Sequence, residues 1–135
     1  MNELNRKAMV LGNKLAPRMG GDRKAAFVQA WLIVKAGRLT LPVRGVSFGN
    51  RQEALSRLAG YNPSDVWAVL VPEPENPVDP TAVAVMVGVQ GGRGLYRLGY
   101  VPRTMAPVVA ALGRQLPRLA VVDGTSRGAR ITLGA

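Results

Sequence analysis

The chain lacks the two residue types that most often carry out chemistry in proteins: its 135 residues include no His and no Cys. This composition excludes thiolate zinc sites, iron–sulfur clusters, disulfides, cysteine nucleophiles and Ser-His-Asp machinery. Three acidic residues cluster along the sequence, Glu73, Glu75 and Asp79. Carboxylates can hold Mg²⁺, but the prolines between these residues favour a rigid loop over a metal cage. We therefore expect no catalytic residues, no metal site and no cofactor.

Positive charge is the strongest feature of the composition. The chain has 18 Lys and Arg residues against 8 Asp and Glu, a net charge of +10. Fourteen of the basic residues are Arg, which binds phosphate through two parallel hydrogen bonds and stacks on bases. A GC-rich genome explains an excess of Arg over Lys, but it does not explain the shortage of acids. The composition therefore indicates a protein that binds polyanions.

Nothing in the sequence indicates a membrane segment. The longest apolar run near the start is Ala25–Val34, which Gln29 interrupts and which is half the roughly 20 residues that a membrane span needs. The run also lacks the order of regions that marks a signal peptide. Together with the absence of Cys, these observations predict a cytoplasmic protein with no membrane partner.

Residues 1–37 are predicted to form an N-terminal helical extension. Leu4, Ala8, Leu11 and Leu15 recur at helical spacing, and Pro17 with Gly20-Gly21 ends this first helix. Asp22 is the expected N-cap of a second helix and Gly37 its C-terminal glycine. The apolar stripe predicted for the second helix consists of Phe27, Ala30, Trp31 and Val34. Because both stripes are narrow, we expect this hairpin to dock on the rest of the chain, a second copy or a protein partner.

Residues 38–135 are predicted to form one α+β domain, a small barrel or curled sheet with short helices. An Asn50/Glu53 capping box opens one helix, Pro102 leads another, and the Pro-rich segment Glu73–Pro80 is a loop. The net charge is +5 in residues 1–37, +2 in 38–112 and +3 in 113–135, so the excess lies on the flanks. The expected strands are Leu39–Phe48, Val66–Val71, Ala82–Val89, Leu95–Val101, Leu119–Val122 and Ala129–Leu133, and the expected helices are Asn50–Leu58 and Arg103–Leu112.

Three sequence blocks resemble the HIRAN domain family. They are Val43-Arg-Gly-Val-Ser-Phe-Gly-Asn-Arg-Gln-Glu53, Glu75-Asn-Pro-Val-Asp-Pro-Thr-Ala-Val-Ala-Val85 and Leu98-Gly-Tyr-Val-Pro-Arg103. Their order and spacing also match the family, and the resemblance covers roughly residues 40–133. It implies an OB-like modified β-barrel with short helices and nucleic-acid binding. In fork-remodelling translocases of the SWI/SNF type, the HIRAN domain captures a single-stranded DNA end by its 3′-hydroxyl.

The resemblance also implies a set of binding residues. Phe48 matches an aromatic that stacks on a base, and Asn76 and Asp79 match the central signature, with Asp79 accepting a hydrogen bond from the terminal hydroxyl. Tyr100 and Arg103 match positions that contact sugar or phosphate. The chain departs from the family at Ser47, where a basic residue is usual, and at Val78, where a second aromatic is usual. Supporting positive charge is expected from Arg44, Arg51, Arg93 and Arg97.

Each of these residues also has a purely structural interpretation. Asn76 and Asp79, next to prolines, are turn formers whose side chains bond nearby backbone groups. Trp31 and Phe27 are expected in a core or interface, and Trp67 in a core. Two hypotheses for the whole protein remain open at this point. One is a non-enzymatic module for single-stranded DNA or DNA 3′ ends in repair, replication or a phage–host context. The other is a protein-interaction module that binds an acidic host replication or transcription factor, with the barrel as scaffold.

Overall fold

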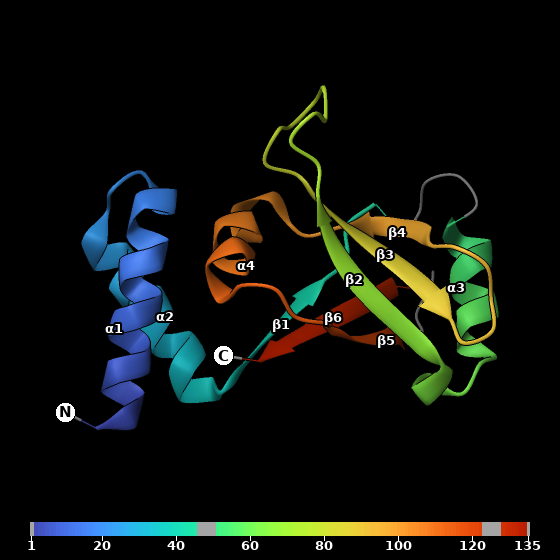
Figure 1. Ribbon diagram of the computed structural model, residues 1–135, viewed down its shortest axis with the longest axis horizontal. Coiled ribbons are helices and arrows are strands. Elements are labelled where there is room, and N and C mark those ends of the chain that lie inside the picture. The colour runs from blue at the N-terminus through green and yellow to red at the C-terminus, as the bar shows by residue number, and fades with distance from the viewer. Residues whose placement is uncertain (1, 46–50, 123–127, 135) are drawn as a thin grey trace. The chain divides into compact units, whose positions relative to one another are not determined.

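The computed structural model describes residues 2–45, 51–122 and 128–134 and divides the chain into two compact units. Unit 1 comprises Met1–Leu39, Pro107–Arg114 and Gly134–Ala135, and unit 2 comprises Thr40–Ala106 and Gln115–Leu133. The described residues form four α-helices and two three-stranded sheets (Figure 1). This confirms the α+β class. In the described ranges, no helix combines the length and apolar content that crossing a bilayer requires.

Unit 1 is built on the predicted helical hairpin. Helix α1 (Glu3–Leu15) continues into a 3-10 turn (Ala16–Met19), and helix α2 (Arg23–Ala36) follows. Asp22 caps α2, because its side chain accepts a hydrogen bond of 3.0 Å from the backbone N–H of Ala25. Gly37 ends α2 in the left-handed region at φ 76°. Both predicted helix ends are thus confirmed. Helix α4 (Ala106–Leu112) lies almost wholly in this unit.

Helices α1 and α2 pack closely through small residues. A Cβ on Gly12 would lie 2.7 Å from the Phe27 ring, so only glycine fits there without a shift. Ala26 and Ala30 are fully buried on α2. Trp31 of the predicted stripe is 37% exposed, so it lies outside the core, because so close a helix contact favours alanine over a bulky ring. The other expectation for Trp31, a place in an interface, stays a prediction. The buried residues of the hairpin are Ala8, Leu11, Gly12, Leu15, Ala16, Ala26, Ala30, Ile33 and Val34.

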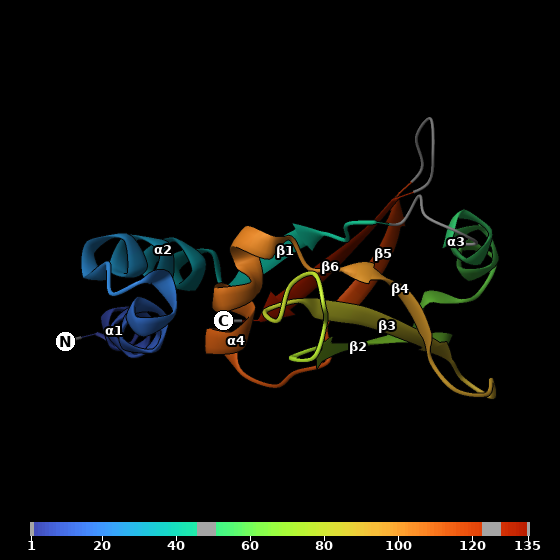
Figure 2. The same ribbon diagram turned by 90° about the horizontal axis from the view of Figure 1, so that it is seen from above.

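Unit 2 contains most of the strand residues. One sheet has the order β1-β6-β5 and the other the order β2-β3-β4, and the pairs β5–β6, β2–β3 and β3–β4 are antiparallel. Helix α3 (Arg51–Ala59) buries Leu55 and Leu58 and lies at one end of the sheets (Figure 2). Asn50 of the predicted capping box lies outside the described residues. The strands are β1 (Arg38–Pro42), β2 (Val66–Pro72), β3 (Val83–Val89), β4 (Tyr96–Tyr100), β5 (Arg118–Val122) and β6 (Gly128–Gly134).

The segment that follows β1 connects the two sheets. The N–H of Val43 donates to the carbonyl of Ala129 in β6 at 2.9 Å. Arg44 and Tyr100 exchange two backbone hydrogen bonds of 2.7 and 2.9 Å, which bring this segment to β4. A Cβ on Gly99 would collide with the carbonyl oxygen of Arg44. The close approach of the Arg44 segment to β4 therefore depends on glycine at position 99.

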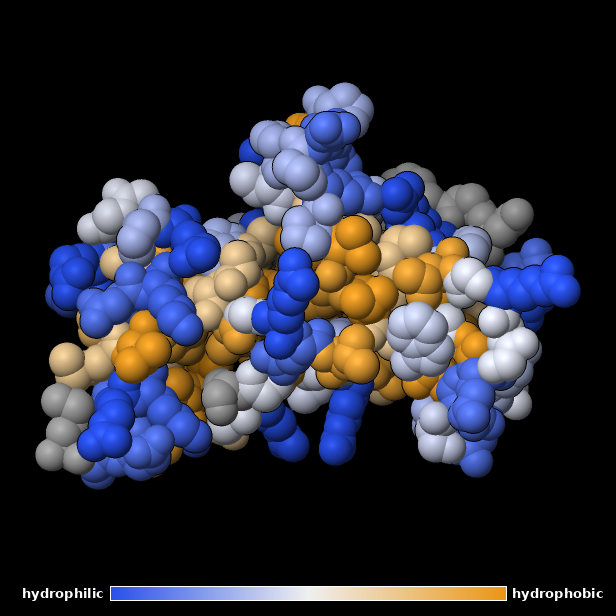
Figure 3. All heavy atoms as spheres, in the orientation of Figure 1, coloured by the Kyte–Doolittle hydropathy of each residue, from blue (hydrophilic) through white to orange (hydrophobic). Residues whose placement is uncertain are grey.

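The core of unit 2 follows the alternation of its strands. Ala68, Val85 and Val87 point inward and are buried, together with Leu98 of β4. Trp67, predicted to lie in the core, is 44% exposed, because it neighbours the inward-pointing Ala68 and so points to the opposite side of β2. Apolar side chains gather on the surface over β2 (Figure 3). The predicted Pro-rich loop is confirmed as the connection between β2 and β3.

Candidate nucleic-acid interface

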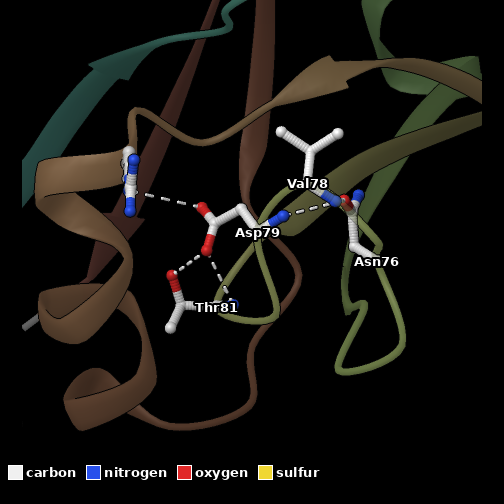
Figure 4. Close-up of polar contacts among 5 residues, drawn as sticks. Asn76, Val78, Asp79 and Thr81 are labelled. Atoms are coloured by element: carbon white, nitrogen blue, oxygen red, sulfur yellow. Dashed lines mark hydrogen bonds and ion pairs between the residues drawn. The ribbon is translucent and has the colours of Figure 1, made fainter.

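The β2–β3 loop is held in shape by its own side chains. The Oδ1 atom of Asn76 accepts hydrogen bonds from the backbone N–H groups of Val78, at 2.9 Å, and Asp79, at 3.1 Å. The Oδ1 atom of Asp79 accepts from the N–H and the hydroxyl of Thr81, at 2.9 and 2.6 Å (Figure 4). These are the local bonds that make Asn and Asp good turn formers. The structural interpretation therefore accounts for the single side-chain oxygen of Asn76 and for one of the two carboxylate oxygens of Asp79.

The second carboxylate oxygen of Asp79 faces Arg103. The Oδ2 atom lies 3.7 Å from Arg103 Nε (Figure 4), and the side chains are 17% and 82% exposed respectively. The hydrogen bonds from Thr81, followed by the positive charge of Arg103, hold the pKa of Asp79 below its usual value. Asp79 is thus a charged acceptor in a fixed orientation, next to a cation that extends into solvent.

A second cluster surrounds the carboxylate of Glu73. Its Oε1 atom accepts hydrogen bonds of 3.0 Å from both Asn76 Nδ2 and the Tyr100 hydroxyl. Its Oε2 atom pairs with Arg97 at 2.7 Å, and the Arg97 guanidinium lies 6.0 Å from the centre of the Tyr100 ring. We call these four residues the Glu73 cluster. Asn76 belongs to it and also to the Asp79 loop, so the two groups are neighbours.

The bonds in the Glu73 cluster fix its protonation states. Hydrogen bonding from Asn76, then from Tyr100 and Arg97, holds the pKa of Glu73 below its usual value. Burial, followed by the hydrogen bond to Glu73, raises the pKa of Tyr100. At neutral pH the cluster therefore contains a carboxylate, a neutral phenol and a guanidinium. Beside it is a hollow of about 490 Å³ lined by Glu73, Pro74, Glu75, Asn76, Pro77, Arg97 and Tyr100.

Of the five binding residues predicted from the sequence, the structure brings four together: Asn76, Asp79, Tyr100 and Arg103. Phe48, like Ser47, lies outside the described residues. Val78, in the position of the second aromatic, is 91% exposed. The role of Glu73 as the common acceptor was missed by the sequence analysis. The sequence signal for it was its place in the acidic cluster with Glu75 and Asp79, at the end of an apolar strand.

Three of the four supporting arginines are neighbours of Tyr100. Arg44 pairs with it through the backbone, Arg51 is close enough for its charge to act on the Tyr100 pKa, and Arg97 lies at its ring. Arg93 is elsewhere, in the turn between β3 and β4. It lines a different hollow of about 490 Å³ beside α3, with Arg57, Leu58, Val87 and Tyr96 among the other lining residues.

The two carboxylates of the site are each paired with an arginine, Glu73 with Arg97 and Asp79 with Arg103. In the part of the chain that the structure describes, no group of three His, Cys, Asp or Glu side chains is placed to hold a metal. Unit 1 has nine basic and two acidic residues, and unit 2 has nine basic and six acidic residues, so their net charges are +7 and +3. The predicted charge excess outside the central domain thus falls mainly on the helical unit.

No protein-family model, curated protein or solved structure matches the chain. The HIRAN resemblance stays a prediction that rests on the three sequence blocks.

Proposed function

We propose that the protein is a non-enzymatic nucleic-acid-binding module for single-stranded DNA or DNA 3′ ends. In this proposal unit 2 is an OB-like barrel of the HIRAN type. Three features support that fold: the two sheets, the Arg44–Tyr100 pair that joins them, and the contact of β2 with β5. A role in repair, replication or a phage–host context follows from the same resemblance.

The observation that carries the proposal is the pairing of Asp79 with Arg103. A 3′-hydroxyl can donate a hydrogen bond to Asp79 Oδ2, while Arg103 contacts the last phosphate. Thr81 holds the other carboxylate oxygen, so the acceptor is oriented before DNA arrives. A carboxylate in a phosphate-binding groove repels the phosphates of its ligand, and a free hydroxyl on the ligand gives Asp79 a group to bind.

The Glu73 cluster supplies the next contacts along the strand. Arg97 can reach a phosphate, and the Tyr100 ring offers an apolar surface to a sugar. Because Val78 has no ring, the end pocket has one stacking surface fewer than the family pattern. Sequence-independent attraction to the positive charge of both units therefore supplies much of the affinity.

Fluorescence anisotropy with labelled oligonucleotides tests this function. Three ligands are compared over a salt series: a single strand ending in 3′-OH, the same strand ending in 3′-phosphate, and a duplex. We expect affinity to fall steeply with salt for all three and to be highest for the 3′-OH strand. Asp79→Asn keeps an oxygen that can accept from Thr81, but it replaces Oδ2, the proposed acceptor for the 3′-hydroxyl, with an NH₂ group that donates. The substitution should therefore abolish the preference for 3′-OH.

Glu75→Gln is the matched control for this substitution. Glu75 is an exposed acid on the same loop, and its replacement removes one negative charge, as Asp79→Asn does. Glu75→Gln should leave the ratio of 3′-OH to 3′-phosphate affinity unchanged. Negligible binding of all three oligonucleotides at low salt would rule the function out. Equal effects of the two substitutions on both strand ends would rule out recognition of the end.

A second candidate function, binding of an acidic protein segment, is favoured by the surface of α2. Val28, Trp31 and Leu32 are exposed at helical spacing, between Lys24 and Lys35. An amphipathic helix with acidic residues beside its apolar stripe complements this surface, whereas a second copy of a unit with net charge +7 is repelled. A synthetic acidic amphipathic peptide should bind the wild-type protein, and Leu32→Glu should abolish that binding. No binding, or equal binding of a sequence-scrambled peptide, counts against this candidate.

A further inference from the structure

The outer face of the β2–β3–β4 sheet carries a row of residues that leads away from the Glu73 cluster. Trp67, Val69 and Val71 of β2 alternate with buried Ala68 and lie on this face. Across β3 they pair with Gly88, Met86 and Ala84, and on β4 the row continues with Arg97 and Tyr100. We call this surface the outer face. It joins an exposed tryptophan to the tyrosine of the proposed site through one continuous sheet.

Trp67 and Gly88 fit each other on this face. A Cβ on Gly88 would lie 2.8, 2.9 and 3.1 Å from three adjacent atoms of the indole ring, so the ring lies directly over the glycine. Trp67 nevertheless stays 44% exposed. Apolar side chains gather on the surface over β2, the strand that carries Trp67 (Figure 3). A large ring that rests on the backbone and is open to solvent is the arrangement that a base needs for stacking.

We infer that the outer face is a stacking platform for single-stranded nucleic acid, extending the proposed site from Tyr100 to Trp67. This inference rests on the proposed function and adds the path of the strand. Val71 and Trp67 are four residues apart on β2, about 13 Å along the strand. About four stacked nucleotides cover that length at 3.4 Å each. A base stacks on Trp67, while Arg97 contacts phosphate near Tyr100.

Charge on the outer face favours a nucleic acid over a protein partner. Its acidic neighbour, Glu73, forms an ion pair with Arg97 and accepts a hydrogen bond from Tyr100, so the pair carries no net charge that would repel a phosphate, and the net charge of +10 on the whole chain attracts one. Arg97 remains half exposed beside the Tyr100 ring and combines a cation with an aromatic surface, as single-strand sites commonly do. A second copy of the chain is a poor occupant, because two molecules of net charge +10 repel each other.

Tryptophan fluorescence tests the platform without changing Trp67. The chain has two tryptophans, Trp31 and Trp67, so Trp31→Phe leaves Trp67 as the only one. We expect a single-stranded oligo(dT) to quench this fluorescence, with the same concentration dependence as its anisotropy. Trp67→Ala should weaken oligo(dT) binding roughly 5- to 150-fold, the range expected for one stacked base. Trp67→Phe should lose less oligo(dT) affinity than Trp67→Ala, because the phenylalanine ring can still stack on a base.

Trp31→Ala is the matched control, since it removes the other exposed tryptophan and should change the affinity less than twofold. If oligo(dT) binds but Trp67 is not quenched and Trp67→Ala binds normally, the platform is wrong and the proposed function stands. If the wild-type protein binds no oligonucleotide, both are wrong. Should Trp67→Ala fail to fold by circular dichroism, the quenching in the Trp31→Phe protein decides alone: quenching supports the platform and its absence refutes it.

Discussion

Replacing Gly99 with alanine should separate the two sheets of unit 2 where Arg44 pairs with Tyr100. The added Cβ would collide with the carbonyl oxygen of Arg44 and would lie 2.7 Å from Val43 Cγ1. Val43 is buried and its branched side chain has little freedom to rotate, and the carbonyl belongs to the backbone pair itself. The collision can therefore be relieved only by moving Arg44 away from β4, which breaks the pair.

The expected cost follows from what the pair contains. Two backbone hydrogen bonds, of 2.7 and 2.9 Å, contribute about 0.5–1.5 kcal/mol each to folding. Displacing packed residues around an added carbon costs a further 1–3 kcal/mol or so. We expect Gly99→Ala to lower the free energy of unfolding by about 2–6 kcal/mol. Because Tyr100 moves with the pair, oligonucleotide binding should weaken as well.

Urea denaturation followed by circular dichroism measures this change, and Gly128→Ala is the control. Gly128 begins β6, has no atom within 4 Å of its added Cβ and has no positive φ. An alanine there should be neutral or stabilise by up to about 1 kcal/mol, because it restricts the unfolded chain. If Gly99→Ala is as stable as Gly128→Ala, the close approach of Arg44 to β4 is not as described.

Three further predictions concern the clusters described above. Glu73→Gln should remove part of the acid sensitivity of folding: the pKa of Glu73 is lowered below its ordinary 4.5, so its stabilisation exists above that pH and disappears as pH falls through the folded pKa. Urea titrations from about pH 6 to 3, with Glu75→Gln as control, check this. Tyr100→Phe removes a hydrogen bond to a charged group, and thermal denaturation should show a loss of about 1.5–3 kcal/mol at neutral pH; an unchanged stability contradicts the bond. Gly12→Ala should destabilise the helical unit by about 1–3 kcal/mol through its collision with Phe27, seen as a lower helical melting temperature, and a wild-type melting temperature contradicts the close helix packing.

Much of the fold could be predicted from local sequence signals. Asp22 and Gly37 marked the ends of α2 because capping depends on residues next to the helix. The Pro-rich loop and the strands around it were also evident. Trp67, predicted in the core, was misplaced, because it points outward where the inward position belongs to Ala68. Of the two places predicted for Trp31, the core is taken by small residues because two helices approach closely, and an interface stays a prediction. Both outcomes depend on contacts between elements, which periodicity along one segment does not show.

The candidate site divides in the same way. Asn76, Asp79, Tyr100 and Arg103 were identified by the motifs that resemble a family, and the fold places them near one another. The role of Glu73, which accepts hydrogen bonds from several of the site's side chains, was not identified, because its partners Arg97 and Tyr100 lie 24 and 27 residues away in the sequence. The β2–β3 and β3–β4 pairings together bring them side by side. A pairing of that range cannot be inferred from one sequence without knowing the register of the sheet.

The most direct test of the central claim is a structure of the protein bound to a short single-stranded DNA with a free 3′-hydroxyl. We predict the terminal hydroxyl within hydrogen-bonding distance of Asp79 Oδ2 and the last phosphate beside Arg103. A strand that binds the protein with its 3′ end far from Asp79, or one held by the helical unit alone, would contradict the account.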